Sequence, residues 1–486
     1  MPRALSTFLL LTLGLTAAAQ GIPEGARVGD PANAKPDPRA LGAIGGEGIP
    51  WAAGSAVGIE VTSLLPDGAG SRAGLRVGDV IVGVGSKGLA GGNAWLVLTA
   101  LIEKPRKEGK AVVLRVRRGN ESRKLDLVIP AAKKKPKGTF EECERCRAIR
   151  PRALAKLASM QSEDGSFPTQ LGGTNGRVAV TSIASLAFIA GGSSTKEGEF
   201  SEPLAKARDW LVGNVGKENR AFTQGSGKNW SQVNWALGYG SLALARIHAL
   251  EPTDAVKAKL LELRDALIGN MEASGGWAHG PSNELPYPLD YAELTACGNI
   301  CLAGLGEIRS VGIDVPKEKI ALAVNYVVMS SDGGGGVGYS ARAGQRGMGA
   351  AGRTASMVLA MSRLGMERHP FYKKLTGYLR QNLADTPHGH VSPAFHYFFA
   401  AQASRVMGRK DWSAFVAAFR TEMLSLWNGD GTFGIRPADT SRVGFPNTDR
   451  TMGVAWRTAT YAMILGLESG RLDRPAGEFL TPPKKK

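Results

Sequence analysis

The chain has 486 residues, of which 43% are hydrophobic, so it is long enough for two to four domains and apolar enough to bury a core in each. This composition excludes wholesale disorder. The net charge is +17, but charged residues make up only an ordinary 21% of the chain, so the excess reflects a shortage of acidic residues and not an abundance of basic ones. We therefore expect no specific nucleic-acid partner.

Residues 1–19 have the pattern of a secretory signal. Arg3 precedes an apolar run from Leu5 to Leu15, and three alanines end at Ala19. We expect export to a periplasmic or extracellular location, with no transmembrane segment after signal removal, because no later window offers about 18 uninterrupted apolar residues. The alternative is an N-terminal anchor that stays uncleaved.

Two segments follow the signal. Residues 20–50 are rich in Gly, Pro and Ala and predict a flexible leader. Residues 51–130 predict a small mixed α/β domain. Its strands are expected at 58–64, 80–84, 112–117 and 124–129, with one helix at 93–103.

The stretch Ala73-Gly74-Leu75-Arg76-Val77-Gly78-Asp79-Val80-Ile81 resembles the A-G-L-x-x-G-D-x-I signature of bacterial PDZ domains. The resemblance implies a groove that captures a protein or peptide C-terminus as an added strand. Val57-Gly58-Ile59 would supply backbone N–H groups, and Gly58 suits close approach because it lacks a Cβ. Leu98 and Ile102 would line the opposite wall. A packing module that has lost peptide binding is the alternative.

Basic segments flank the rest of the chain. Residues 131–139 form a lysine-rich linker, and residues 475–486 form a basic tail. Such runs are usually solvated. They also offer a surface for an anionic glycan or a lipid head group, and salt would weaken that contact.

Residues 140–474 carry helical periodicity throughout and predict an all-α body of six helical hairpins. The expected helices are 143–160, 177–191, 199–215, 230–250, 253–272, 290–311, 316–329, 352–366, 370–384, 391–407, 410–427 and 449–469. The second helix of each pair is rich in small, uncharged residues, which indicates an inner ring with the first helices outside. This is the pattern of an (α/α)6 toroid.

Four loops inside the hairpins repeat a glycine beside an aromatic: Asp164-Gly165-Ser166-Phe167, Gly275-Gly276-Trp277, Gly336-Val337-Gly338-Tyr339 and Asp430-Gly431-Thr432-Phe433. The glycine supplies a left-handed cap and the aromatic a plug against the next hairpin. With Met160-Gln161 ahead of the first copy, the repeat resembles that of the terpenoid cyclase and prenyltransferase toroid superfamily, which implies the fold.

No complete catalytic motif of these toroids is present. Asp290-Tyr291-Ala292-Glu293 opens an inner helix, but Ala292 stands where a cyclase would need its proton donor. No zinc-binding trio of the prenyltransferases can be placed. The catalytic residues are therefore unassigned, no cofactor is predicted, and whether the chain is an enzyme stays open.

The cysteines form two sequence-local pairs, Cys143-x-x-Cys146 and Cys297-x-x-x-Cys301. Export favours oxidation, with a bridge between the first and sixth helices as one arrangement. A four-thiolate zinc site is another, and buried free thiols are favoured for Cys297 and Cys301. His388, His390 and His396 crowd one inner helix and suit a cavity lining better than a metal, so no metal is predicted.

If the ring closes, six inner-helix N-termini open on one mouth and favour an anionic or polyhydroxylated ligand. The mouth candidates are Arg177, Trp277, Asp290, Glu293, Arg353, His388, His390 and Asp430, with Trp230, Trp235 and Tyr291 as further stacking surfaces.

Two functional classes follow from this mouth. The first is an exported adaptor that docks a peptide on the PDZ-like domain and a ligand at the mouth. The second is an enzyme acting on carbohydrate or lipid, with Asp290 or Glu293 as general acid or base, assisted by His390. A third interpretation, which we favour for the acids themselves, is that they only cap helices or pair with neighbouring arginines.

Overall fold

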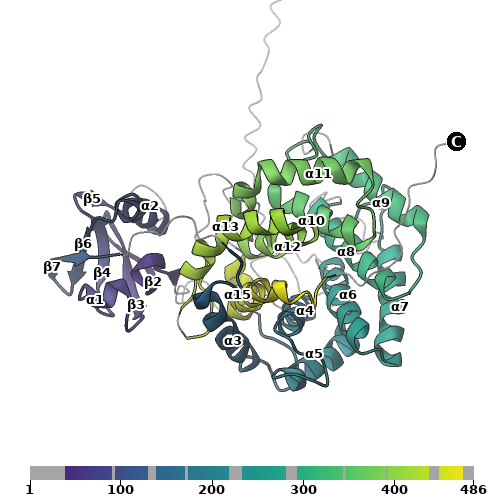
Figure 1. Cartoon of the computed structure of the whole chain (residues 1–486), viewed down its shortest axis with the longest axis horizontal. Helices are drawn as coiled ribbons and strands as arrows, with labels where there is room; N and C mark the ends of the chain where they lie inside the picture. The colour runs from purple at the N-terminus through teal and green to yellow at the C-terminus, as the bar shows by residue number, and fades with distance from the viewer. Residues whose placement is uncertain are drawn as a thin grey trace, which may run out of the picture.

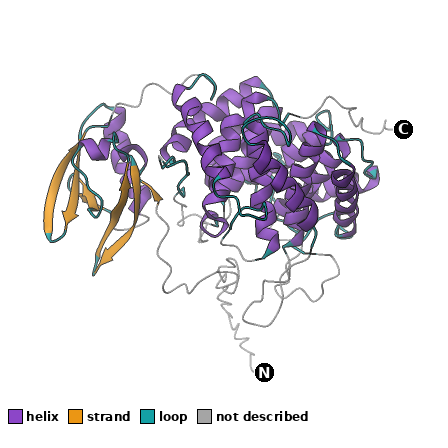
Figure 2. Ribbon diagram, turned by 90° about the horizontal axis from the view of Figure 1, so that it is seen from below, coloured by secondary structure: helices purple, strands orange, loops and turns teal. Residues whose placement is uncertain are grey.

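The computed structural model describes residues 39–89, 94–129, 138–169, 173–217, 232–280, 293–342, 346–388, 392–428, 430–436 and 448–473. They form a small antiparallel sheet unit beside a larger helical body (Figures 1 and 2). The expected signal at 1–19, most of the basic linker and the basic tail lie outside the described residues.

The sheet unit joins its strands in the order β1-β2-β3-β4-β6-β7, with β5 on β4, and every neighbouring pair is antiparallel. Its core lies between the sheet and α2, and includes Ile59, Val61, Ile81, Leu114 and Val116. The elements are β1 (Arg39–Ala40), 3₁₀ helix η2 (Gly42–Ile44), β2 (Gly46–Ala53), β3 (Ala56–Leu64), α1 (Ala69–Arg72), β4 (Val80–Val84), β5 (Lys87–Gly88), α2 (Ala94–Lys107), β6 (Val112–Arg118) and β7 (Glu121–Leu127).

The sheet begins earlier than the sequence indicated. Strand β1 and the first five residues of β2 lie within the segment expected to be a flexible leader, and β2 pairs with β3 from Gly46 opposite Leu64 to Ala53 opposite Ala56. The glycine-rich sequence of β2 has no apolar alternation, so its strand structure depends on the partner strand. Residues 39–50 are therefore part of the sheet unit.

The expected peptide groove is not formed by the residues proposed for it. Val57-Gly58-Ile59 lie in β3, which pairs with β2 on one edge and with β4 on the other. A Cβ on Gly58 would lie 2.7 Å from Cγ1 of Val80 and 2.9 Å from the carbonyl oxygen of Ile81. The glycine thus permits close packing of strands. Leu98 and Ile102 are buried in the core under the sheet and line no groove.

The helical body contains six inner and six outer helices among the described residues. The inner helices are α4 (Thr174–Ala190), α6 (Val233–Leu250), α8 (Thr295–Ser310), α10 (Ala351–Arg363), α12 (Pro393–Val406) and α15 (Asp449–Gly466). The outer helices are α3 (Glu144–Ala158), α5 (Ser201–Asn214), α7 (Asp254–Gly269), α9 (Lys317–Ser330), α11 (Pro370–Gln381) and α13 (Arg409–Ser425).

The inner helices close into a ring. Each packs against the next in the order α4, α6, α8, α10, α12 and α15, and α15 packs against α4. Each outer helix packs most closely against the inner helix that precedes it in the chain, and α3 packs most closely against α15. The arrangement is an (α/α)6 toroid, and Figure 1 shows the outer helices around it.

Small residues explain why the inner helices approach closely. A Cβ on Gly238 of α6 would lie 3.0 Å from the backbone carbon of Ile300 on α8, and one on Gly304 of α8 would lie 3.2 Å from the carbonyl oxygen of Gly238. Outer helices are amphipathic instead: α7 buries Val256, Leu260, Leu263 and Leu267 at helical spacing. The inner and outer roles predicted from composition thus match the burial of the two helix sets.

The inner-helix C-termini meet at the end of the ring that is opposite the long loops. Glu307 of α8 is buried there between Arg246 of α6 and Arg363 of α10, each 2.7 Å from a carboxylate oxygen. Arg246 also donates to the carbonyl oxygen of Asp473 at 2.6 Å, and Arg363 to that of Leu472 at 2.8 Å. Residues 472–473 therefore cross this end of the ring, which we call the closed end.

The two units contact each other where η2 packs against α13. A cavity of about 770 Å³ lies between them, with Arg72 and Arg106 on the sheet side and Arg145, Arg152 and Trp427 on the toroid side. Within the described ranges, no helix is both long and apolar enough to cross a membrane.

Candidate functional site: the mouth of the ring

The loops that lead from outer to inner helices share one turn. In it the N–H of Ser162, Glu272, Asp332 or Asn428 donates to the carbonyl oxygen four residues later, at 2.8 to 3.0 Å. The glycine in each turn has a positive φ: 89° at Gly165, 94° at Gly275, 97° at Gly335 and 103° at Gly431. The residue two positions after each glycine is fully buried: Phe167, Trp277, Val337 and Phe433. The turns fix the rim of one mouth.

Each turn also rests on the next outer helix. A Cβ on Gly165 would lie 2.4 Å from the carbonyl oxygen of Lys206 on α5, and one on Gly275 would lie 2.4 Å from that of Leu322 on α9. The glycine-and-plug repeat expected from sequence is therefore a clip between hairpins. In the third copy the plug is Val337, not the expected aromatic Tyr339, which is only partly buried.

Two expected ligand-binding arginines bind the protein itself. Arg177 pairs with Asp164 and Ser166, and its guanidinium lies 5.0 Å from the ring centre of Trp210. Arg353 is buried, donates to the carbonyl oxygens of Val337 at 3.2 Å and Met348 at 2.7 Å, and lies over Tyr339. Burial lowers the pKa of Arg353 to about 10. Both arginines close loops.

The acidic candidates have similar local roles. Asp430 accepts the backbone N–H of Thr432 at 2.8 Å and its hydroxyl at 2.7 Å. Glu293 accepts the hydroxyl of Ser274 at 2.5 Å. Burial, and then the nearby charge of Glu293, raises the pKa of Glu272 on the same rim. These contacts lie within the rim turns, and neither of them caps a helix.

The other candidates divide into three groups. Trp277 is fully buried and donates to the carbonyl oxygen of Leu267 at 2.8 Å, so it is a plug and offers no stacking face. His388 ends the 3₁₀ helix η3 (Leu383–His388) and is half-buried. Outside the described residues lie Asp290 and His390, together with Trp230 and Tyr291.

The structure brings together a set of aromatic side chains on α6 and α12 at the mouth. Nε1 of Trp235 donates to Nδ1 of His279 at 2.7 Å, and the Trp235 ring meets Phe395 edge-on with centroids 5.8 Å apart. Phe395 in turn contacts His396. Trp235 and His279 are half-buried, so this aromatic cluster is open to solvent. His279 and Phe395 were not predicted from the sequence.

Asp449, the first residue of α15, joins α15 to α12. Its carboxylate accepts the hydroxyl of Ser392, the N–H of Ala394 at 3.1 Å and Nε1 of Trp456 at 3.2 Å. Burial raises the pKa of Asp449 although these donors and the charge of Arg457 oppose the rise. Asp449 is thus a buried carboxyl group whose pKa lies above its ordinary value.

Buried polar side chains on α6 and α4 lack a hydrogen-bond partner within the described residues. The buried hydroxyl of Tyr239 has no hydrogen-bond partner among the described residues, and its ring packs against Phe398 and Trp456. The side-chain amide of Asn175, in the first turn of α4, is buried and likewise unpaired within the described part of the chain. A buried polar group without a partner is costly, so these atoms are suited to a ligand hydroxyl or to water.

The cysteines adopt a local arrangement. Cys143 and Cys146 are bridged to each other, whereas Cys297 and Cys301 are free and buried in α8. A bridge between the first and sixth helices is therefore not formed, because each cysteine of α3 finds its partner one turn away. No group of three or more His, Cys, Asp or Glu side chains in the described ranges is arranged to hold a metal ion.

Comparison with known proteins gives one family. A family model described as "Domain of unknown function (DUF6288)" matches residues 177–465, which run from α4 to α15. No curated protein matches the chain by sequence.

Three solved structures illustrate the similarity in fold. An inactive variant of an α-1,6-mannanase of Salegentibacter sp. HEL1_6, in complex with α-1,6-mannotriose, is 10% identical, with a TM-score of 0.48 over 67% of this chain and 99% of that one. A cellobiose 2-epimerase from Spirochaeta thermophila is 13% identical, with a TM-score of 0.47 over 68% and 97%. A type II terpene cyclase from Scytonema is 14% identical, with a TM-score of 0.38 over 67% and 99%. The ring itself is established by the contacts between its helices.

Proposed function

The chain belongs to the DUF6288 family, whose match covers the toroid and not the sheet unit, and on this premise we propose that the protein acts on a carbohydrate at the mouth of the ring. The aromatic cluster of Trp235, His279 and Phe395 is the observation that carries the proposal. Sugar rings present apolar C–H faces that pack on aromatic rings, and a half-buried tryptophan beside a polar interior offers such a face.

The polar groups below the cluster suit the hydroxyls of the same ligand. Tyr239 and Asn175 provide donor and acceptor atoms without partners in the described residues. A neutral sugar fits better than the anionic ligand expected from charge, because Arg177 and Arg353 already bind protein groups. The proposed substrate is therefore a neutral polyhydroxylated chain that enters at the rim.

The reaction that we propose is cleavage of a glycosidic bond, with Asp449 as the proton donor. A general acid must hold its proton at working pH, and burial raises the pKa of Asp449 in that direction. Such hydrolysis needs a second carboxylate. Asp290, the acid proposed from the sequence, lies outside the described residues.

Binding is tested by calorimetry with a panel of neutral and acidic oligosaccharides. Trp235→Ala should weaken binding of a neutral glycan by about ten-fold, since stacking on an aromatic face contributes on the order of 1 kcal/mol. Trp51→Ala is the matched control, because Trp51 is a half-buried tryptophan in β2 of the sheet unit. Equal affinity of all three proteins would contradict the proposed site.

Hydrolysis is tested by following new reducing ends during incubation with the glycan that binds. We expect Asp449→Asn to abolish product formation while the variant still binds the glycan and keeps its helical circular dichroism. Release of sugar at the wild-type rate by this variant would show that Asp449 is not the proton donor. A protein that binds glycan without cleaving it would leave only a binding function.

Capture of a peptide C-terminus by the sheet unit is a second proposal, taken from its PDZ-like motif. The observation that favours it is the edge of β2, where β1 pairs only with Glu47 and Gly48 and the rest is unpaired within the described residues. Such an edge can accept an added strand. A peptide library should then bind with free C-termini and lose affinity on amidation; equal binding of both forms would refute carboxylate capture.

Export is proposed from the signal pattern of residues 1–19. Expression in a bacterial host followed by cell fractionation tests it. We expect the protein outside the cytoplasm, with an N-terminus near Gln20, and full-length protein in the cytoplasm would refute export. In an exported protein the basic linker and tail are available to an anionic glycan or lipid head group.

A further inference from the structure

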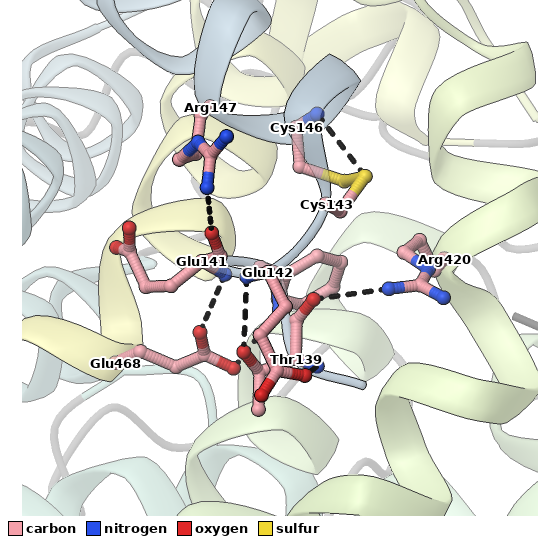
Figure 3. The surroundings of a disulfide bond; sticks show 9 residues. Thr139, Glu141, Glu142, Cys143, Cys146, Arg147, Arg420 and Glu468 are labelled. Carbon is pink, nitrogen blue, oxygen red and sulfur yellow. Dashed lines mark hydrogen bonds between the residues drawn. A yellow bond between two sulfur atoms is a disulfide. The ribbon is translucent and has the colours of Figure 1, made fainter. Parts of the chain in front are cut away.

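The disulfide lies at the start of the helical body, where the chain arrives from the sheet unit. Cys143 is the N-cap of α3, and its sulfur accepts the backbone N–H of Cys146 at 3.2 Å (Figure 3). A hydrogen bond from a helix N-terminus favours a sulfur that carries negative charge. When the bridge is open, the same N–H would therefore favour the thiolate of Cys143.

The two sulfurs differ in access. Cys146 is buried on the inner side of α3, with 2% of its surface exposed, whereas Cys143 is only partly buried. An external thiol can therefore reach Cys143 and not Cys146. One accessible and one buried cysteine, separated by two residues at a helix start, is the arrangement that thiol–disulfide exchange requires.

The charges around Cys143 also favour a thiolate. Arg145 and Arg147 lie in the first turn of α3, and Arg147 donates to the carbonyl oxygen of Glu141 at 2.9 Å. Arg420 of α13 donates to the carbonyl oxygen of Thr139 at 3.0 Å. Arg147 and Arg420 thus bring positive charge to the residues before the helix.

The nearby acids are bound by other groups. Glu141 pairs with Arg150, and Glu142 accepts the N–H of Thr139 at 2.8 Å. Glu468 accepts the N–H groups of Phe140 and Glu141 at 3.0 and 2.7 Å, and Nε1 of Trp412. Glu144, also in the first turn, is exposed to solvent. Arg150 compensates the charge of Glu141, and the charges of Glu142 and Glu468 act on Arg420.

We propose that Cys143–Cys146 is an exchangeable disulfide that oxidises an external dithiol. A thiolate of the dithiol attacks the sulfur of Cys143, forming a mixed disulfide, and the bond to Cys146 breaks with its electron pair passing to Cys146, which takes up a proton. The second thiol of the dithiol then displaces Cys143. The protein gains two electrons and two protons, and the dithiol leaves as a disulfide.

Exchange would act on the junction between the two units. Residues 139–143 are held by Glu468 and Arg420 of the toroid, and Arg145, Ala148 and Ile149 of α3 line the cavity between the units. Reduction removes the covalent tie between Cys143 and the first turn of α3, so the redox state is linked to the wall of this cavity.

The first test measures exchange in the folded full-length chain with Cys297→Ala and Cys301→Ala, so that only the bridge reports. Samples are equilibrated with reduced and oxidised glutathione over a range of ratios, quenched in acid, and labelled with a maleimide that shifts the protein on a gel. We expect a reversible transition between bridged and reduced forms while circular dichroism stays native. A bridge that resists excess dithiothreitol until the chain unfolds would overturn the proposal.

The second test separates the two cysteines. In the same background, Cys146→Ser leaves Cys143 and Cys143→Ser leaves Cys146. Alkylation by iodoacetamide at pH 7 should be at least about ten-fold faster for Cys143 than for Cys146, and faster than for glutathione at that pH. Equal rates for the two variants, or a Cys143 no more reactive than glutathione, would mark the bridge as purely structural.

Discussion

Arg246 on α6 and Glu307 on α8 form an ion pair buried at the closed end of the ring, with 2.7 Å between Nη2 and Oε2. The same carboxylate binds Arg363 of α10, so one acid ties three consecutive inner helices. Substitution of one partner in such a group leaves the other charges buried and uncompensated.

We therefore expect Glu307→Gln to lower the free energy of unfolding by about 3 to 5 kcal/mol. The control is Glu262→Gln on α7, since Glu262 is exposed and pairs only with Lys259. That change should cost less than about 1 kcal/mol. Urea denaturation followed by circular dichroism measures both, and equal losses would contradict a special role for the buried group.

Two glycines with positive φ, one in a rim turn and one outside the rim turns, separate the cost of backbone strain from the cost of a steric clash. Gly275 has a φ of 94°, and its Cβ would meet the carbonyl oxygen of Leu322 at 2.4 Å. Gly312 has a φ of 85° with no atom within 4 Å of its Cβ position. Gly312→Ala should cost about 1 kcal/mol from backbone strain alone, and Gly275→Ala about 1 to 3 kcal/mol more because α9 must shift. Thermal unfolding measures the two losses of stability, and equal losses would show that packing on α9 is unimportant.

Two aspartates should give opposite pH dependence. The pKa of Asp449 is raised above its ordinary 3.8 by burial, so the folded state holds that proton more tightly than the unfolded state does. The stability difference between wild type and Asp449→Asn should therefore decrease as the pH rises from about 3.8 through the raised pKa. Denaturation midpoints between pH 3 and 7 would show this trend. A stability difference that grows with pH would mean that folding lowers the pKa of Asp449.

Asp79 provides the contrasting case. Burial tends to raise its pKa, but hydrogen bonds from Arg118 at 2.7 and 2.8 Å and from the N–H of Arg76 outweigh burial, and the pKa is lowered below 3.8. The stability that Asp79 contributes is present above pH 3.8 and is lost as the pH falls through the lowered pKa. The advantage of wild type over Asp79→Asn should therefore shrink on acidification; an advantage that persists at pH 2 would contradict it.

Salt distinguishes the neutral from the anionic ligand. The described mouth arginines Arg177 and Arg353 are bound to protein groups. Raising NaCl from about 0.05 to 0.5 M should therefore change the affinity for a glycan less than about two-fold. Calorimetry at both concentrations measures this, and a ten-fold weakening would instead indicate an anionic ligand.

The toroid could be predicted from sequence because burial and composition agree over whole helices. Val178 to Ala190 is uncharged and belongs to a fully packed inner helix, whereas α7 alternates apolar and charged faces. The turn glycines were recognisable for the same reason: Gly165 and Gly431 stand next to residues that must be buried.

The mouth was harder to predict because a charged side chain can already be bound to protein groups and is then not available to a ligand. Arg353 looks like a ligand-binding residue in sequence, but its position in the first turn of α10 directs it to the carbonyl oxygens of Val337 and Met348. The aromatic cluster depends on residues 160 positions apart, Trp235 and Phe395, and only ring closure brings them together. In the sheet unit, β2 was missed because its sequence, Gly-Glu-Gly-Ile-Pro-Trp-Ala-Ala, does not alternate apolar and polar residues.

The last described residues have a practical consequence for experiments. Leu472 and Asp473 lie across the inner-helix C-termini, held by Arg246 and Arg363. The chain therefore departs from the face that is turned away from the rim loops. An affinity tag or immobilisation anchor fused directly after Asp473 would begin on that far face, so surface-coupled protein would keep the proposed sugar entrance directed toward the bulk solution.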